Sequence, residues 1–198
     1  IMGLALLGLR MAAHESPMFK AMGEHVSKGS LWQLVGHRDR LKRYVLCILT
    51  GLPTWFAIGL LGVFSPELAR AVGIDGEVKA AQVLMMLYLG LVIGDLLSGL
   101  FSQWLASRRK VMTLFVLGVA VLSTVYLLAD GLSVQAFYGL CLLLGISTGY
   151  WAVFVTNAAE QFGTNLRATV ATSAPNFVRG AVVPMTLAFE ALRDSMGA

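Results

Sequence analysis

Long apolar runs separated by short charged segments dominate this chain. Since a transmembrane helix needs about 20 apolar residues, the runs long enough to cross a bilayer are 44–64, 80–106, 111–129, 134–159 and 168–192. A backbone in lipid must pair its N–H and C=O groups internally, and the ten-residue alternation of a spanning β-strand is not seen in these runs. We therefore expect an all-α, polytopic bundle with five complete transmembrane helices.

A further apolar run at 1–9 stops at Arg10 and is too short to span. We interpret it as the end of another transmembrane helix, followed by a cytoplasmic linker at 10–43 and the helix bundle at 44–198. An apolar stripe in the linker consists of Leu31, Leu34 and Val35. Two interpretations of the linker remain open, an amphipathic helix on the membrane surface and an ordinary solvated segment.

Composition and the placement of charge agree with a membrane protein. Hydrophobic residues make up 57% of the chain and charged residues 13%, too few to cover a water-facing surface. Eleven of the 15 Lys and Arg lie on one side of the predicted topology, in 10–43, 108–110 and Arg167. Because basic loops stay in the cytoplasm, this side is predicted to be cytoplasmic and the protein to lie in the inner membrane. Since the basic residues lie between apolar runs, nucleic acid is not an expected partner.

Two opposite charges are predicted near the middle of the membrane. Asp95 and Arg179 each lie 11 residues from the cytoplasmic end of their run, a depth of roughly 16 Å. We expect their helices to be neighbours and the charges to neutralise each other. The pair is then either a structural lock or part of a site for solute or proton coupling. Further candidate contacts on the predicted helices are Tyr88, Asn176, Trp55, Tyr150, Trp151 and Asn157.

Three charged segments resemble the major facilitator superfamily, in particular its sugar-porter-like and metabolite–proton symporter branches. Residues 10–19, Arg-Met-Ala-Ala-His-Glu-Ser-Pro-Met-Phe, resemble the R…ESP-x-aromatic signature after helix six. Residues 99–110 resemble the basic loop between helices eight and nine, although Gln103 and Trp104 stand where the family often has Asp-Arg. Residues 160–169, Glu-Gln-Phe-Gly-Thr-Asn-Leu-Arg-Ala-Thr, are similar to the E-x-F-(P/G)-T-x-x-R-A segment after helix ten.

The resemblance implies that the chain is part of the C-terminal half of a twelve-helix transporter. The run at 1–9 would end helix six, and the five spans would be helices seven to eleven. It also implies a cytoplasmic gate in which Arg108 or Arg109 pairs with Glu160. The other residues of this implied gate are Gly99 and Arg167. Solute would bind between two six-helix halves that rock about it. The N-terminal half would therefore be a required partner, and the full-length protein would act as a monomer.

Secondary transport of a small polar or anionic solute is the predicted function, with proton coupling through Asp95 as an option. A non-transporting sensor or scaffold with the same fold is the alternative. An enzyme is not expected, because no His lies in a span and no Gly-x-Ser-x-Gly occurs. Cys47 and Cys141 have no Cys or His neighbours at metal-binding spacing, so we predict no metal site and no cofactor.

Overall fold

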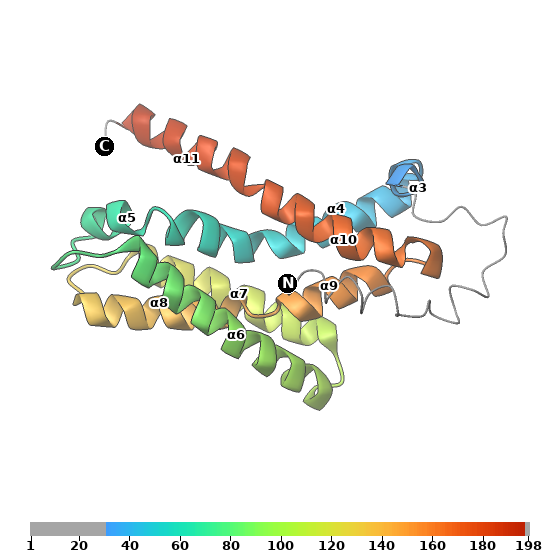
Figure 1. Ribbon diagram of the computed structural model, residues 1–198, viewed down its shortest axis with the longest axis horizontal. Coiled ribbons are helices and arrows are strands. Elements are labelled where there is room, and N and C mark those ends of the chain that lie inside the picture. Colours follow the sequence, from blue (N-terminus) through green and yellow to red (C-terminus); the bar gives the residue numbers. More distant parts are fainter. Residues whose placement is uncertain (1–30, 197–198) are drawn as a thin grey trace, which may run out of the picture.

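The computed structural model describes residues 31–196, which form a bundle of helices running roughly along one axis (Figure 1). The helices are α3 (Leu31–Val35), α4 (Arg38–Trp55), the π-helix η1 (Phe56–Gly62), α5 (Ser65–Ala71), α6 (Ala80–Trp104), α7 (Arg108–Leu127), α8 (Val134–Thr148), α9 (Trp151–Glu160), α10 (Thr164–Gly180) and α11 (Val182–Met196). Within this range the one β-type contact is an isolated bridge between Asp75 and Ser133. The predicted all-α class is confirmed.

Four helical segments are long and apolar enough to cross a membrane, and they indicate a membrane protein. They cover Arg38–Gly62, Ala80–Trp104, Arg108–Leu127 and Val134–Glu160. The fifth predicted run, at 168–192, folds as α10 and α11, which are 17 and 15 residues long. Pro184 in the first turn of α11 has no N–H to bond the carbonyl of Gly180, so the helix is interrupted at Ala181.

The last residues of the predicted linker, at 10–43, are helical in the structure. Helix α4 begins at Arg38, six residues earlier than expected, and α3 occupies Leu31–Val35. Charged residues at 38–43 extend the helix beyond its apolar run, because their long side chains can reach water from a helix end. The predicted helix end at 1–9, and the part of the linker up to residue 30, lie outside the described residues.

Glycines bring α6 and α8 into backbone contact. A Cβ added at Gly94 would lie 2.1 Å from the carbonyl oxygen of Ile146, and one at Gly145 would lie 2.3 Å from that of Leu87. Gly90 and Gly149 face equally close backbone atoms across the same interface. Small residues four apart on both helices let membrane helices approach this closely. This interface is the most extensive between any two helices of the described chain.

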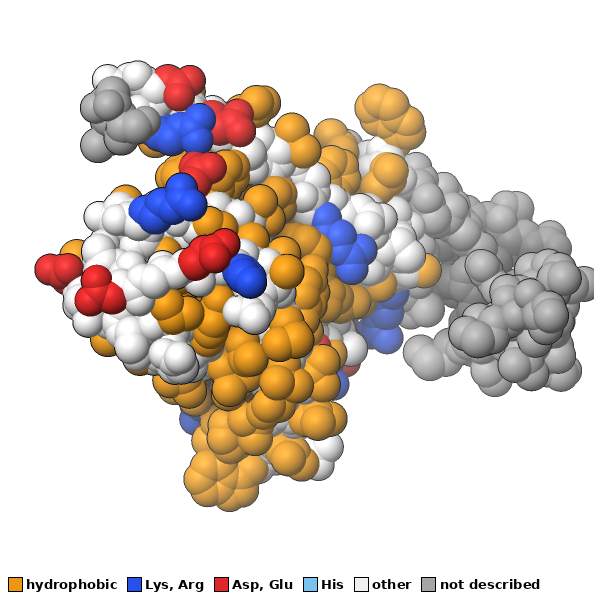
Figure 2. Space-filling view, turned by 60° about the vertical axis from the view of Figure 1, so that its left-hand side comes forward, with side chains coloured by type: hydrophobic (Ala, Val, Ile, Leu, Met, Phe, Trp, Pro, Cys, Tyr) orange, Lys and Arg blue, Asp and Glu red, His pale blue; other side chains and the backbone are white. Residues whose placement is uncertain are grey.

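The polarity of the molecular surface changes along the bundle axis. Hydrophobic side chains cover much of the middle of the molecule, and charged side chains lie toward both ends (Figure 2). We define the basic end by residues 38–43, 104–110 and 160–167, and the opposite end by α5 and residues 128–133. At the opposite end Arg193 of α11 donates to Glu67 of α5 over 3.0 Å. This hydrogen bond raises the pKa of the Arg193 guanidinium above its ordinary value.

Candidate functional site

Three interrupted helices meet in the bundle. Pro53, within α4, removes one backbone hydrogen bond, and the chain widens into a π-helix from Phe56. The span Val134–Glu160 breaks at Gly149 and Tyr150, between α8 and α9. The third interruption is the one at Ala181, between α10 and α11. Interrupted helices leave backbone polar groups free at membrane depth, where transporters commonly bind solute.

One arginine connects the three interruptions. The guanidinium carbon of Arg179, near the end of α10, lies 5.7 Å from the ring centroid of Trp55 and 5.7 Å from that of Trp151. Trp55 ends α4 and Trp151 begins α9. The two indoles pack edge to face, with their centroids 6.1 Å apart. Because an indole face attracts a cation, the two rings hold the guanidinium at this point. We call Trp55, Trp151, Asn176 and Arg179 the junction site.

Asp95 caps the broken helix beside the junction site. Its Oδ1 accepts a hydrogen bond of 3.1 Å from the backbone N–H of Ala152, in the first turn of α9. A carboxylate at this position satisfies a free N–H and matches the positive end of the helix dipole. On the other side of the break, the carbonyl of Thr148 accepts from the hydroxyl of Thr54 over 3.4 Å. Side chains of α6 and α4 therefore stabilise the break between α8 and α9.

The expected direct pairing of Asp95 with Arg179 is wrong. In the described part of the chain these two residues form no ion pair with each other. Helix α9 packs against both α6 and α10, and α6 and α10 share no extensive interface. The two charges are instead held by consecutive residues of α9, Asp95 by Ala152 and Arg179 by Trp151. The sequence could not show this, because the prediction took 134–159 as one continuous helix with no free N–H groups.

The other predicted solute contacts fall in different places. Asn176 belongs to the junction site, where its Oδ1 accepts a hydrogen bond of 3.4 Å from Arg179. Tyr150 is fully buried and donates to the carbonyl of Thr50 over 2.7 Å, so it joins α9 to α4. Tyr88 lies two turns from Asp95 on α6, with 48% of its surface exposed. Asn157 lines a separate cavity near the basic end.

That cavity, of about 590 Å³, lies between α4, α7 and α9. Its polar lining residues are Thr50, Arg109, Thr113, Asn157 and Gln161. A second hollow, of about 580 Å³, lies on the outward face of α10 and α11 and includes Asn176 and Ser173. This second hollow shares Asn176 with the junction site, and Arg179 is not among its lining residues.

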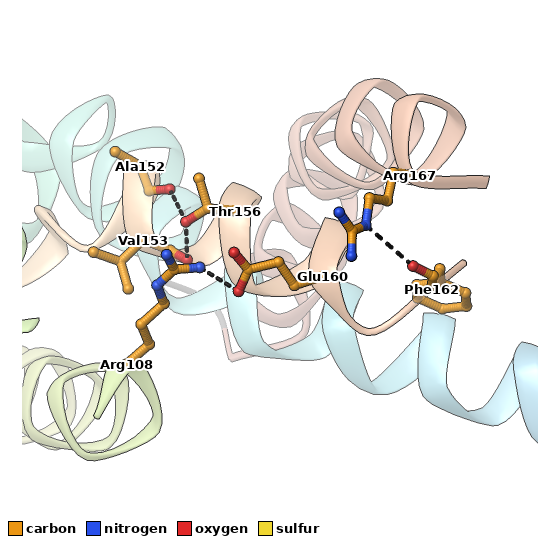
Figure 3. Close-up of polar contacts among 7 residues, drawn as sticks. All are labelled: Arg108, Ala152, Val153, Thr156, Glu160, Phe162 and Arg167. Atoms are coloured by element: carbon orange, nitrogen blue, oxygen red, sulfur yellow. Dashed lines mark hydrogen bonds and ion pairs between the residues drawn. The ribbon is translucent and has the colours of Figure 1, made fainter. Parts of the chain in front are cut away.

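Four of the five predicted gate residues gather at the basic end. Arg108 at the start of α7 forms an ion pair with Glu160 at the end of α9, as the family resemblance implied for Arg108 or Arg109 (Figure 3). Arg167 lies on the other side of Glu160 in the same view and donates to the carbonyl of Phe162 over 3.4 Å. Arg109 lines the 590 Å³ cavity, and a Cβ on Gly99 would meet no atom within 4 Å.

We expect Glu160→Gln to lower the free energy of unfolding by less than about 1 kcal/mol. The Arg108 and Glu160 side chains are 41% and 52% exposed, and exposed ion pairs contribute little in water. Thermal unfolding in detergent at low and at high salt measures the effect. The difference between wild type and variant should shrink at high salt, because ions screen an exposed pair. A large, salt-independent loss would show that the pair is effectively buried.

Sequence reasoning missed how the junction site is built. Trp55, Trp151 and Arg179 were each predicted as candidates, but nothing in the pattern indicated that they touch. The available signals were Pro53, Gly149 and Pro184, which mark the three interruptions. In residues 31–196 no group of three His, Cys, Asp or Glu residues is placed to hold a metal ion. Comparisons with models of protein families, with curated proteins and with solved structures find no match to this chain.

Proposed function

We propose that this chain is part of a secondary transporter of the major facilitator type, which moves a small polar or anionic solute across the inner membrane. The observation that carries the proposal is the position of Arg179. It lies at the meeting point of three interrupted helices, and within the described residues it forms no ion pair with an acid. A cation at membrane depth without an acidic partner favours an anionic ligand.

The face that carries Arg179 is unsuited to lipid. Asn176 and Arg179 are exposed on α10, and Asn176 lines a hollow together with Ser173. By contrast, α6 exposes an apolar row made up of Met85, Leu89, Val92, Leu96 and Leu100. A guanidinium facing hydrocarbon is costly, so the α10 face must meet water or other protein. We propose that it lines a solute cavity shared with a second, N-terminal group of helices, while α6 faces lipid.

The contacts suggest how binding would move the helices. An anion that pairs with Arg179 competes with the two indole rings for the guanidinium. Trp151 and Ala152 are consecutive, so a movement of Trp151 would also shift Ala152 and disturb its hydrogen bond with Asp95. The other end of α9 is held to α7 by Glu160 and Arg108. Helix α9 thus connects the junction site to the proposed cytoplasmic gate, as alternating access requires.

The test is reconstitution of the full-length protein in liposomes. Labelled organic acids, sugars and amino acids are offered with and without an imposed proton gradient. Uptake of an anionic solute, competed by other carboxylates, would support the proposal. Binding of a solute without any flux would overturn it in favour of the sensor or scaffold.

We expect Asp95→Asn to abolish gradient-driven uptake and to leave exchange of solute intact. The amide oxygen of asparagine still accepts from Ala152, so the helix cap is kept, but asparagine cannot carry a proton. Asp95→Leu removes the cap as well and should reduce both activities. Counterflow and gradient-driven uptake in the same liposomes measure the two activities. Equal loss of both in Asp95→Asn would contradict a role in proton coupling.

A further inference from the structure

A second polar site lies at the basic end, away from the junction site. Two adjoining cavities, of about 500 and 220 Å³, share the side chains of Arg40 and Asn165. Trp32 and His37 line the larger cavity, and Arg43 lines the smaller. The walls come from α3, the first turns of α4 and the loop before α10. Two regions distant in the sequence, 32–43 and 161–166, therefore converge here.

Hydrogen bonds join the segments that line these cavities. Arg40 donates to the backbone carbonyl of Gln33 over 3.3 Å, and the Asn165 amide donates to the Gln33 side chain over 3.4 Å. These bonds hold α3 against α4 and against the start of α10. Arg40 donates from Nη1 to Gln33 and has five N–H donors in all, so its other donors are not used by this hydrogen bond.

The charge of the site is positive. No acidic residue lines either cavity, and neither Arg40 nor Arg43 forms an ion pair with an acid in the described chain. Arg38 and Lys42 are close in sequence, and Asp39 is the one acid between residues 37 and 43. Two arginines at one cavity form a favourable setting for a phosphate group, because guanidinium donors match phosphate oxygens.

The site lies at the level of lipid headgroups. The uncharged run of α4 begins at Tyr44, about 6 Å along the helix axis from Arg40 at 1.5 Å per residue. Trp32 is 83% exposed, and Leu31 and Val35 are about half exposed beside it. Trp is typical of the boundary between hydrocarbon and water. An exposed indole beside two arginines at this depth fits the glycerol and phosphate region of a lipid.

We propose that Arg40 and Arg43 bind the phosphate of an anionic phospholipid, with Trp32 against its glycerol and upper acyl chains. Nothing in the proposed transport reaction requires this site. Basic pockets beside membrane helices bind anionic headgroups in this way, and the attraction falls with increasing salt. A bound lipid would hold α3 and the α9–α10 loop together at the proposed cytoplasmic end.

The experiment uses the full-length protein in a neutral detergent. Phosphatidylglycerol or phosphatidylcholine is added, and native mass spectrometry and thermal unfolding follow binding. We expect phosphatidylglycerol to bind and to raise the melting temperature, and phosphatidylcholine to do neither. Arg40→Ala with Arg43→Ala should weaken phosphatidylglycerol binding about 30-fold, since each basic residue near the surface contributes about 1 kcal/mol.

Two matched variants test the assignment. Arg70→Ala with Lys79→Ala removes two exposed cations at the opposite end and should leave binding unchanged. Arg40→Lys with Arg43→Lys keeps the charge and should retain part of the binding, which guards against a misfolded alanine variant. Unchanged phosphatidylglycerol binding in the alanine variant would overturn the proposal. An equal thermal shift with inorganic phosphate would also overturn it, in favour of a soluble phosphate ligand.

Discussion

Replacing Gly94 by alanine is expected to lower the free energy of unfolding by about 3 kcal/mol, the upper part of the range for overpacking. The new methyl group would lie 2.1 Å from the carbonyl oxygen of Ile146. The obstacle is helix backbone, which cannot rotate away like a side chain. Helices α6 and α8 must therefore separate and lose contacts along their whole interface. Unfolding of the protein in detergent, followed by circular dichroism, measures the loss.

Gly99→Ala on the same helix is the matched control. A Cβ there meets no atom within 4 Å, and alanine is a better helix former than glycine by about 1 kcal/mol. We therefore expect Gly99→Ala to be neutral or slightly stabilising. Gly145→Ala, across the interface, should resemble Gly94→Ala, because its Cβ would meet Leu87. If Gly94→Ala and Gly99→Ala were equally stable, the close approach of α6 and α8 would be disproved.

Arg179→Gln should weaken uptake of an anionic solute roughly 10- to 100-fold, which corresponds to the loss of a hydrogen bond to a charged group. Glutamine carries no positive charge to attract an anion, and it also lacks the guanidinium that contacts the two indole rings. Initial rates of uptake into liposomes, measured over a range of solute concentrations, separate weaker binding from slower transport. The effect should appear mainly in the solute concentration that gives half-maximal rate.

Arg193→Gln is the control for the loss of one arginine. It removes the ion pair with Glu67 at the opposite end and should leave uptake unchanged. Arg179→Lys keeps the charge but loses the planar group that lies over Trp55 and Trp151, so an intermediate effect is expected. Full uptake in Arg179→Gln would show that this arginine only packs against the indoles, and the proposed solute site would lose its main support.

The hydrophobic pattern alone was enough to predict the helical class and four of the membrane-crossing segments. A run of about 20 apolar residues lies in lipid, where the backbone has no water to bond. Its N–H and C=O groups must then pair with each other, so helix formation follows from composition and length. The pattern also placed Arg108 and Glu160 at the same end of the bundle. The pairing itself was implied by the resemblance to the major facilitator superfamily, and the structure shows that ion pair.

The tertiary structure decided how the charges of Asp95 and Arg179 are held. Asp95 and Arg179 are opposite in sign, and the sequence favours their pairing. However, the helix breaks at Gly149 and Tyr150, between α8 and α9, and the break exposes an N–H group that takes Asp95 as a cap. Arg179 then rests on indoles from two other helices. Local sequence determines which segments are helices, because backbone pairing is local. Which groups hold a charge at membrane depth depends on where the interruptions of distant helices meet, and only packing brings these together.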